Sequence, residues 1–211
     1  MRCLPFLLLP VFLLVGCSLI PDPLPRAAEY ELRLPSSVQT GQTFEALEGA
    51  AASDVAAFGG GAAAFSGGEL SELEVPAPSW LQSRAIYYRL DYREEARRRA
   101  YTQSRWLAHP SEMITLALVR YFSVSDQRAA ARHLRLHLDE MIHIFTTEQD
   151  SHTLLQVRAE LVEPGRPVSA RRNFTIRRPA PTPDAAGAVA AHNQALAQLA
   201  QDLHVWLRGR M

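Results

Sequence analysis

The stretch LRLHLDEMIHI, residues 134–144, decides the fold. Its leucines and isoleucines recur at every second position, and most of the residues between them are polar. A period of two over this length predicts one long β-strand with a single apolar face. The apolar positions are Leu134, Leu136, Leu138, Ile142 and Ile144, and the polar positions between them are Arg135, His137, Asp139 and His143.

Two histidines in this region require a choice between a strand and a helix. His133 and His137 have the i, i+4 spacing with which two helical side chains can bind one metal ion. On a strand, at about 3.3 Å per residue, they lie about 13 Å apart, which is too far to share an ion. Because the leucines follow the strand period, we expect no metal site here.

Two more strands follow the first. Leu155, Val157, Ala159 and Leu161 are in phase, and Val168, Ala170, Phe174 and Ile176 form a second alternating set after the turn at 163–167. Short turns between such strands predict an antiparallel meander with one apolar face.

Two charged residues fall on that apolar face if the alternation is uninterrupted. Glu140 lies in the first strand and Arg172 in the third. Either the two are buried as an ion pair, or a β-bulge near each one returns it to water. We favour the bulges.

Shorter alternating patterns upstream predict further strands, and a charged connection joins two of them. Arg93, Arg97, Arg98 and Arg99 stand beside Glu94 and Glu95 in this connection, so a solvated hairpin loop is the simplest interpretation, and an anionic headgroup or partner site is the alternative. The predicted strands are 30–34, 70–75, 85–90 and 101–106, and the connection is 91–100.

Two helices complete the pattern. The first is predicted to begin at Pro110 or Ser111 and to run to Phe122, with Glu112 near its positive end. The second begins after Asp184 and carries an apolar stripe at three- and four-residue steps, with Gly209 as its stop. The stripe contains Val189, His192, Leu196, Leu199, Leu203 and Trp206, and we interpret His192 as a packing residue. The fold class is therefore α+β: a largely antiparallel sheet with two main amphipathic helices packed on it, in a single compact domain.

The N-terminus resembles a lipoprotein export signal. Arg2 precedes an apolar run that ends in Leu14-Val15-Gly16-Cys17, and the prolines from Pro21 onward stop the run well short of the about 20 residues that a membrane span needs. Leu-Val-Gly-Cys matches a bacterial lipobox, which predicts a signal peptide at 1–16 and a lipid anchor on Cys17. The alternative is an ordinary secretory signal with a chance cysteine at its end.

A tether and an insertion precede the main pattern. Residues 17–28 form a proline-rich spacer, and the domain is expected at 29–208. Residues of about 45–69, mostly alanine and glycine, predict a flexible insertion, although its aromatic and aliphatic residues could instead dock on a partner or line a cavity. Those residues are Phe44, Val55, Phe58 and Phe65.

Composition limits the function classes. The formal net charge of zero argues against bulk nucleic-acid binding. Of the two cysteines, Cys3 leaves with the signal and Cys17 carries lipid, so no thiol remains for a disulfide, a metal or a nucleophile. We expect no cofactor beyond the covalent lipid on Cys17.

The middle of the chain resembles the ABC-type transport auxiliary lipoprotein family, the PqiC-like lipoproteins. The resemblance rests on Ile86-Tyr87-Tyr88-Arg89, then Tyr101, Arg105-Trp106, and Pro110 before Met113-Ile114-Thr115-Leu116. It implies an outer-membrane lipoprotein, facing the periplasm, that assists a lipid transport system with MCE-domain and ABC or permease components. It also implies that the protein is not an enzyme and that Trp106 is a core residue and Pro110 a helix-cap residue. Whether the chain forms a homo-oligomer is left open. Ser18 after the lipobox cysteine resembles the class sorted to the outer membrane.

Catalytic motifs are lacking in the sequence. It contains no Gly-x-Ser-x-Gly elbow, no His-Glu-x-x-His, no Cys-x-x-Cys pair and no nucleotide-binding loop. Asp139 and Glu140 are adjacent, so on a strand they point to opposite faces and cannot act as a carboxylate pair. The alternatives to a transport auxiliary are an envelope hydrolase whose site is assembled from scattered residues, with His143→Ala as its test, and a purely structural envelope lipoprotein.

Overall fold

Two long antiparallel strands form the middle of the sheet. The computed structural model describes residues 26–34, 70–122, 132–163 and 168–210. Within them, β5 (His133–Phe145) pairs along its whole length with β6 (Ser151–Val162), and β6 pairs with β7 (Ala170–Pro179). The meander predicted from the alternating residues is confirmed.

The shorter strands extend the sheet beyond β5. The seven-stranded sheet has the order β1-β4-β3-β5-β6-β7, and β2 pairs with the beginning of β5. The pairs β3/β4, β5/β6 and β6/β7 are antiparallel, and β1/β4, β2/β5 and β3/β5 are parallel. The strand bounds are β1 Ala28–Tyr30, β2 Glu72–Glu74, β3 Ala85–Leu90 and β4 Arg98–Trp106, and a 3-10 turn lies at Ser79–Leu81.

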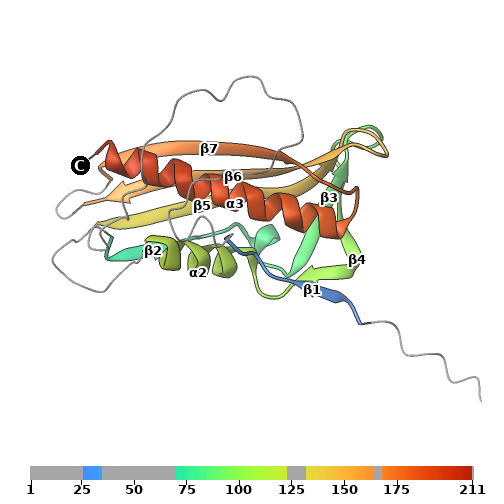
Figure 1. Cartoon of the computed structure of the whole chain (residues 1–211), viewed down its shortest axis with the longest axis horizontal. Coiled ribbons are helices and arrows are strands. Elements are labelled where there is room, and N and C mark those ends of the chain that lie inside the picture. Colours follow the sequence, from blue (N-terminus) through green and yellow to red (C-terminus); the bar gives the residue numbers. More distant parts are fainter. Residues whose placement is uncertain (1–25, 35–69, 123–131, 164–167, 211) are drawn as a thin grey trace, which may run out of the picture.

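Both helices cover the same face of the sheet. In Figure 1, α3 (Ala185–Arg208) lies across the long strands, and α2 (Pro110–Phe122) lies beside β2 on the same side. The main core fills the space between them and the sheet. Leu134, Leu136 and Leu138 reach it from β5, and Leu118 and Leu203 reach it from the helices. The predicted α+β single domain is confirmed.

The helix α3 is fixed at both ends by local contacts. Asp184 accepts a hydrogen bond from the Gly187 N–H at 2.7 Å, which satisfies one of the free N–H groups of the first turn. The predicted stripe is buried from Val189 to Trp206, and Gly209 occupies the C-cap position. The 24 residues of α3 therefore bury one continuous face against β6 and β7.

A β-bulge interrupts β5 at Asp139. Leu138 pairs with Val157 but Glu140 pairs with Gln156, so β5 contains one extra, unpaired residue there. Beyond the bulge Met141 faces the helices, whereas Ile142 and Ile144 lie on the opposite face, where they cluster with Leu154 and Tyr87. The bulge predicted near Glu140 is confirmed, and the prediction of one uninterrupted apolar face is wrong for Ile142 and Ile144.

The second predicted bulge, near Arg172, is absent from the described strand. The register of β7 against β6 is continuous, and Arg172 pairs with Ala159 on the helix-covered face. Arg172 is nevertheless exposed, because β7 is an edge strand and its long side chains extend past the helix. Its guanidinium lies 5.1 Å from the centre of the Phe174 ring. No Glu140–Arg172 ion pair forms within the described structure.

Several predicted element limits need correction, among them those of the strand predicted at 70–75, which is observed at Glu72–Glu74. The strand predicted at 30–34 ends at Tyr30, although Leu32 and Leu34 are buried as expected. The connection predicted to end at 100 is shorter, because β4 begins at Arg98. Val168 lies just before β7 rather than inside it. Glu29 explains the position of β1, because it accepts hydrogen bonds from both Arg84 and Arg105 at 2.6 Å.

No helix in the described ranges combines the length and the apolar character needed to cross a membrane.

Candidate functional site

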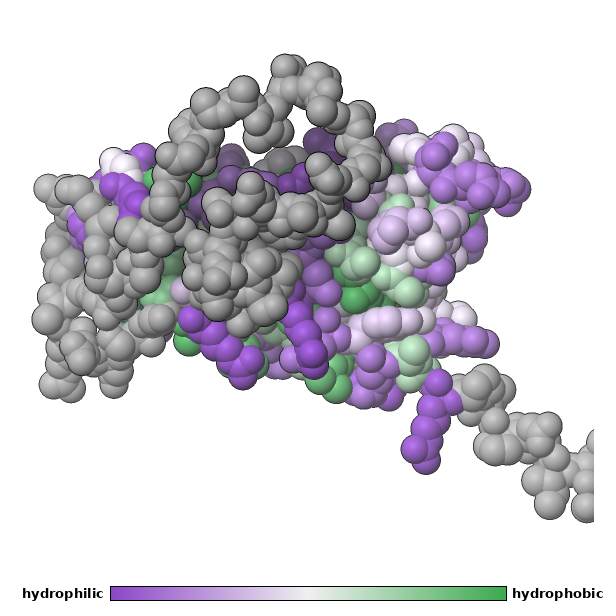
Figure 2. Space-filling model, in the orientation of Figure 1, coloured by the Kyte–Doolittle hydropathy of each residue, from purple (hydrophilic) through white to green (hydrophobic). Residues whose placement is uncertain are grey.

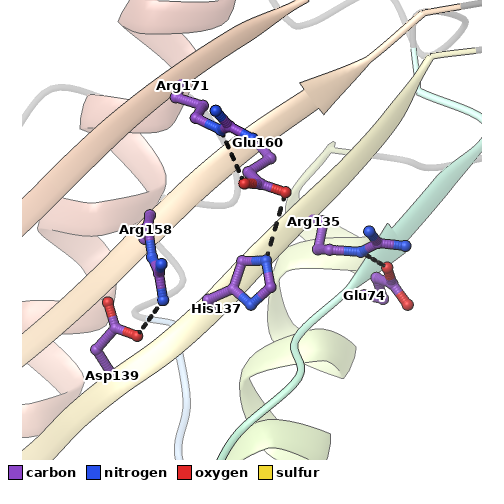
Figure 3. A network of polar contacts seen from close by, with 7 residues as sticks. All are labelled: Glu74, Arg135, His137, Asp139, Arg158, Glu160 and Arg171. Carbon is purple, nitrogen blue, oxygen red and sulfur yellow. Dashed lines mark hydrogen bonds and ion pairs between the residues drawn. The ribbon is translucent and has the colours of Figure 1, made fainter. Parts of the chain in front are cut away.

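The face of the sheet opposite the helices carries a row of ion pairs. Figure 3 shows Glu160 accepting from Arg171 at 3.0 Å and lying 3.5 Å from His137, while Arg158 binds Asp139 at 2.9 Å. Arg135 binds Glu74 of β2 beside them. The hydrogen bond from Arg171 is the main reason why the pKa of Glu160 lies below its usual value. Each carboxylate in this row already has a cationic partner.

This row of ion pairs is therefore more typical of a hydrated binding surface than of a catalytic site. A pair of carboxylates that exchanges protons needs two acids whose pKa values differ and that share one substrate. Here the acids are separated by arginines, and the Arg135–Glu74 and Arg158–Asp139 pairs are exposed enough that each contributes little to stability. Asp139 and Glu140 stand at the bulge and bind different arginines, Arg158 and Arg98.

The two histidines considered as metal ligands lie on this face and bind different acids. His133 Nδ1 is 3.2 Å from Glu72 Oε2, and His137 Nε2 is 3.5 Å from Glu160 Oε2. Among the residues that the structure describes, no group of three or more histidines, cysteines, aspartates or glutamates could hold a metal ion.

The arginines of the connection between β3 and β4 are paired with nearby acids. Arg97 and Arg99 both bind Glu94, at 3.1 and 2.8 Å, and Arg93 lies 3.6 Å from Glu148 of the next turn. The two arginines lower the pKa of Glu94 through their hydrogen bonds. This arrangement favours the solvated hairpin over a site for an anionic headgroup.

Glu140 has a partner that the sequence did not indicate. Its side chain is 16% exposed and accepts a hydrogen bond from Arg98 of β4 at 2.5 Å, and it also accepts from the Met141 N–H at 2.9 Å. The Arg98 guanidinium lies 5.4 Å from the centre of the Tyr87 ring. Arg98 and Tyr87 thus lie next to the small cluster of Ile142, Ile144 and Leu154.

His143 is buried against aromatic rings under the helix-covered face. It is 0% exposed, its Nδ1 lies 2.9 Å from the Tyr101 hydroxyl, and its ring contacts Phe145. Burial lowers the pKa of His143 to about 4. Its Nε2 has no hydrogen-bond partner, and Tyr101 is its hydrogen-bond partner at Nδ1, so its described contacts contain neither a nucleophile nor an orienting carboxylate.

His192 packs inside the core as the helical stripe predicts. It is 2% exposed and meets the Trp106 ring edge-on at 5.9 Å between centroids. Burial lowers its pKa to about 3. Trp106 is itself a core residue, and Pro110 is the first residue of α2.

A shallow cleft between the segment after β1 and α2 escaped the sequence reasoning, because its walls are far apart in the chain. It has a volume of about 290 Å³. Glu31 and Arg33 bind each other at its rim, and Leu116 at its wall is 49% exposed. The lining residues are Glu31, Leu32, Arg33, Leu34, Met113, Leu116, Ala117 and Arg120. Figure 2 shows hydrophobic residues in scattered groups on the visible described surface.

The sequence comparison decides the family. The profile of the ABC-type transport auxiliary lipoprotein component family matches residues 70–204, from just before β2 to near the end of α3. The chain belongs to this family of transport auxiliary lipoproteins. No curated protein matches it.

Solved structures share the fold of this auxiliary lipoprotein. A protein from Xanthomonas campestris, described as a member of family DUF330, is similar with a TM-score of 0.58 and 23% identity, over 66% of this chain and 83% of its own. A second, described only as an uncharacterized protein, has a TM-score of 0.61 and 12% identity, over 86% of this chain and 99% of its own. At these identities the similarity concerns the fold.

The family match covers the domain but not the proposed anchor of the lipoprotein. The residues quoted for the resemblance, from Ile86 to Leu116, all lie inside the matched range. Cys17, the lipobox, the tether before residue 26 and the alanine- and glycine-rich insertion at about 45–69 lie outside the described residues. The lipid anchor on Cys17 and the domain limits at 1–16, 17–28 and 29–208 stay predictions.

Proposed function

We propose that this lipoprotein is a non-catalytic auxiliary of a lipid transport system in the bacterial envelope. It would be held at the outer membrane by lipid on Cys17, with its domain facing the periplasm, and it would contact an MCE-domain protein and ABC or permease components. The observation that carries the proposal is the family match over residues 70–204 in a chain whose residues 14–17 read Leu-Val-Gly-Cys.

Two features support a binding role over a catalytic one. The candidate catalytic histidine, His143, is enclosed by Tyr101 and Phe145, where a substrate would have to displace the core. The acids on the helix-free face are paired with arginines such as Arg158 and Arg171. A catalytic acid or base needs a pKa close to the working pH, whereas a surface of paired charges can bind a partner without one.

The anchor is tested by Cys17→Ser. We expect the native chain to fractionate with the outer membrane and to carry acyl chains on Cys17, detected by mass spectrometry of the N-terminal peptide. Several acyl chains give stable anchoring, so the variant should lose both the lipid and the membrane association. An unmodified N-terminus on a native chain found in the cytosol would overturn the proposal.

The transport role is tested by cross-linking in intact cells. The native lipoprotein should cross-link to an MCE-domain protein of the same envelope, and its deletion should increase sensitivity to detergent.

A test with His143→Ala separates the hydrolase alternative. Activity on a panel of lipids or glycans that this substitution abolishes would favour an enzyme. Deletion without an envelope defect, together with no cross-link, contradicts a transport auxiliary.

A further inference from the structure

In the part of the chain that the structure describes, β7 forms one edge of the sheet and has no strand partner on one side of its backbone. It lies last in the strand order, and within the described residues it pairs only with β6. Its register against β6 is unbroken from Ala170 to Pro179, so the edge is ten residues long and has no bulge. An edge of this length can receive another extended segment by main-chain hydrogen bonds.

The register shows which residues of β7 present their backbone outward. The Ala180 N–H donates to the Ser151 carbonyl at 2.9 Å, directly after the last ladder pair, so residues of even number point their N–H and C=O toward β6. The outward groups then belong to Arg171, Asn173, Thr175 and Arg177. Pro179 has the same outward parity and lacks an N–H, so the free edge ends there.

Most of the charge of β7 is not neutralised by carboxylates of the described residues. Arg171 binds Glu160, but Arg172 lies over the Phe174 ring and Arg178 donates to the neutral amide of Gln198 at 2.6 Å. Arg177 has no carboxylate within ion-pair distance in the described chain. The interior strands differ, because their arginines bind acids: Arg135 binds Glu74, Arg158 binds Asp139, Arg98 binds Glu140 and Arg89 binds Asp91.

We propose that the outer edge of β7 binds an extended acidic segment of a partner protein by strand addition. Carboxylates on such a segment would lie opposite Arg172, Arg177 and Arg178, and opposite charges on neighbouring strands attract. A second β7 edge is a poor occupant, because its arginines would lie against those of the first. The inference does not depend on the transport role, since it specifies the chemistry of the partner segment only.

The test uses the full lipidated chain in detergent and synthetic ten-residue peptides as probes. One peptide alternates pairs of glutamates with pairs of threonines, which places carboxylates on both faces of the added strand, and a matched peptide has lysine in place of glutamate. We expect the acidic peptide to bind at least about tenfold more tightly in fluorescence anisotropy, and less tightly as salt is added. Equal binding of both peptides overturns the proposal.

Main-chain pairing is tested separately from charge. Bound acidic peptide should slow hydrogen exchange of the Asn173, Thr175 and Arg177 amides, which point outward. Thr175→Pro removes one outward N–H without removing a bond to β6, so it should weaken peptide binding about tenfold, whereas Thr175→Val should bind like the native chain. The double variant Arg172→Glu, Arg177→Glu should also lose binding.

Three outcomes contradict strand addition by an acidic partner. Binding without protection of the outward amides would indicate a diffuse electrostatic contact. Unchanged affinity in Thr175→Pro, with native circular dichroism, would exclude main-chain pairing at this edge. Protection that appears without peptide and rises with protein concentration would make a second copy of the chain the occupant.

Discussion

Gly187, in the first turn of α3, has no room for a side chain. A Cβ at this position would lie 2.0 Å from the Thr182 carbonyl oxygen, which is backbone and cannot move aside cheaply. Replacing glycine by alanine inside a helix ordinarily stabilises it by about 1 kcal/mol. At residue 187 the close approach of the 182–184 turn reverses that sign.

Gly187→Ala should lower the free energy of unfolding by about 2 kcal/mol, because the N-terminal turn of α3 must shift away from Thr182. Urea unfolding followed by circular dichroism measures the change. Gly209→Ala is the matched control: the nearest backbone atoms to its Cβ lie at 3.7 Å, so we expect a change within about 0.5 kcal/mol. A stabilised Gly187→Ala variant would show that the turn is not packed as described.

At the scale of elements, the N-terminus of α3 depends on one carboxylate. Asp184 accepts from the Gly187 N–H and from the Thr182 hydroxyl at 2.8 Å, and the Gly187 N–H is the largest cause of its lowered pKa. Asp184→Ala should cost about 1 kcal/mol at neutral pH, while Asp184→Asn, which can keep the cap, should cost less. Because the folded pKa is depressed, the advantage of aspartate is present above the unfolded pKa and is lost as pH falls through the folded value. Urea unfolding at several pH values measures both variants. Equal free energies of unfolding for Asp184→Ala and Asp184→Asn would contradict this prediction.

The bulge in β5 brings Glu140 to Arg98, and this pair is the one that should couple. A double-mutant cycle of Arg98→Ala and Glu140→Ala should give an interaction energy of about 1 kcal/mol, because the residues share a partly buried hydrogen bond. The same cycle with Arg172→Ala and Glu140→Ala should be additive within about 0.5 kcal/mol, since no contact joins them. Coupling in the second cycle and none in the first would contradict the assigned pairing.

At the scale of the whole molecule, the two buried histidines make stability depend on pH. Burial lowers the pKa of His143 to about 4 and that of His192 to about 3, whereas both titrate near 6.5 when unfolded. Between these values the unfolded chain binds more protons than the folded one. Stability is therefore greatest above about pH 6.5 and falls as pH drops, by up to about 1.4 kcal/mol per pH unit for each histidine.

His192→Leu should remove one of these two contributions. Among the described residues, the Nδ1 of His192 has no hydrogen-bond partner, so an apolar side chain of similar length removes no hydrogen bond of that atom. Between about pH 7.5 and about pH 5 the variant should lose about 2 kcal/mol less stability than the native chain. An unchanged acid sensitivity in His192→Leu would contradict the assignment.

Periodic patterns predicted the architecture correctly, because in a long element many positions follow the period and a few deviating residues do not hide it. The alternation in residues 155–161 and the stripe from Val189 to Trp206 both predicted the buried faces that the structure shows. The exact site of the bulge could not be read, because Asp139 and Glu140 are both polar and either could be the extra residue. Leu32 and Leu34 show the opposite limit: alternation predicted their burial, but no strand partner continues beyond Tyr30.

Contacts across the sheet were beyond sequence reasoning. Arg98 and Glu140 are 42 residues apart, and they come together because β3, antiparallel to β4 and parallel to β5, lies between these two strands. Arg172 is exposed because β7 is an edge strand, and strand order cannot be derived from alternation. His143 shows the same limit, because only the bulge turns it toward Tyr101 and away from the open face.

The extra residue in β5 has a consequence for shortening the chain. If Asp139 were deleted, Leu138 would be followed directly by Glu140, and plain alternation would then keep Met141 on the inside and Ile142 on the outside as they are now. The strand would become more regular and less twisted, and Arg158 would lose its acid. Loss of a single residue elsewhere between 134 and 144, with the bulge retained, would instead turn one half of the strand inside out.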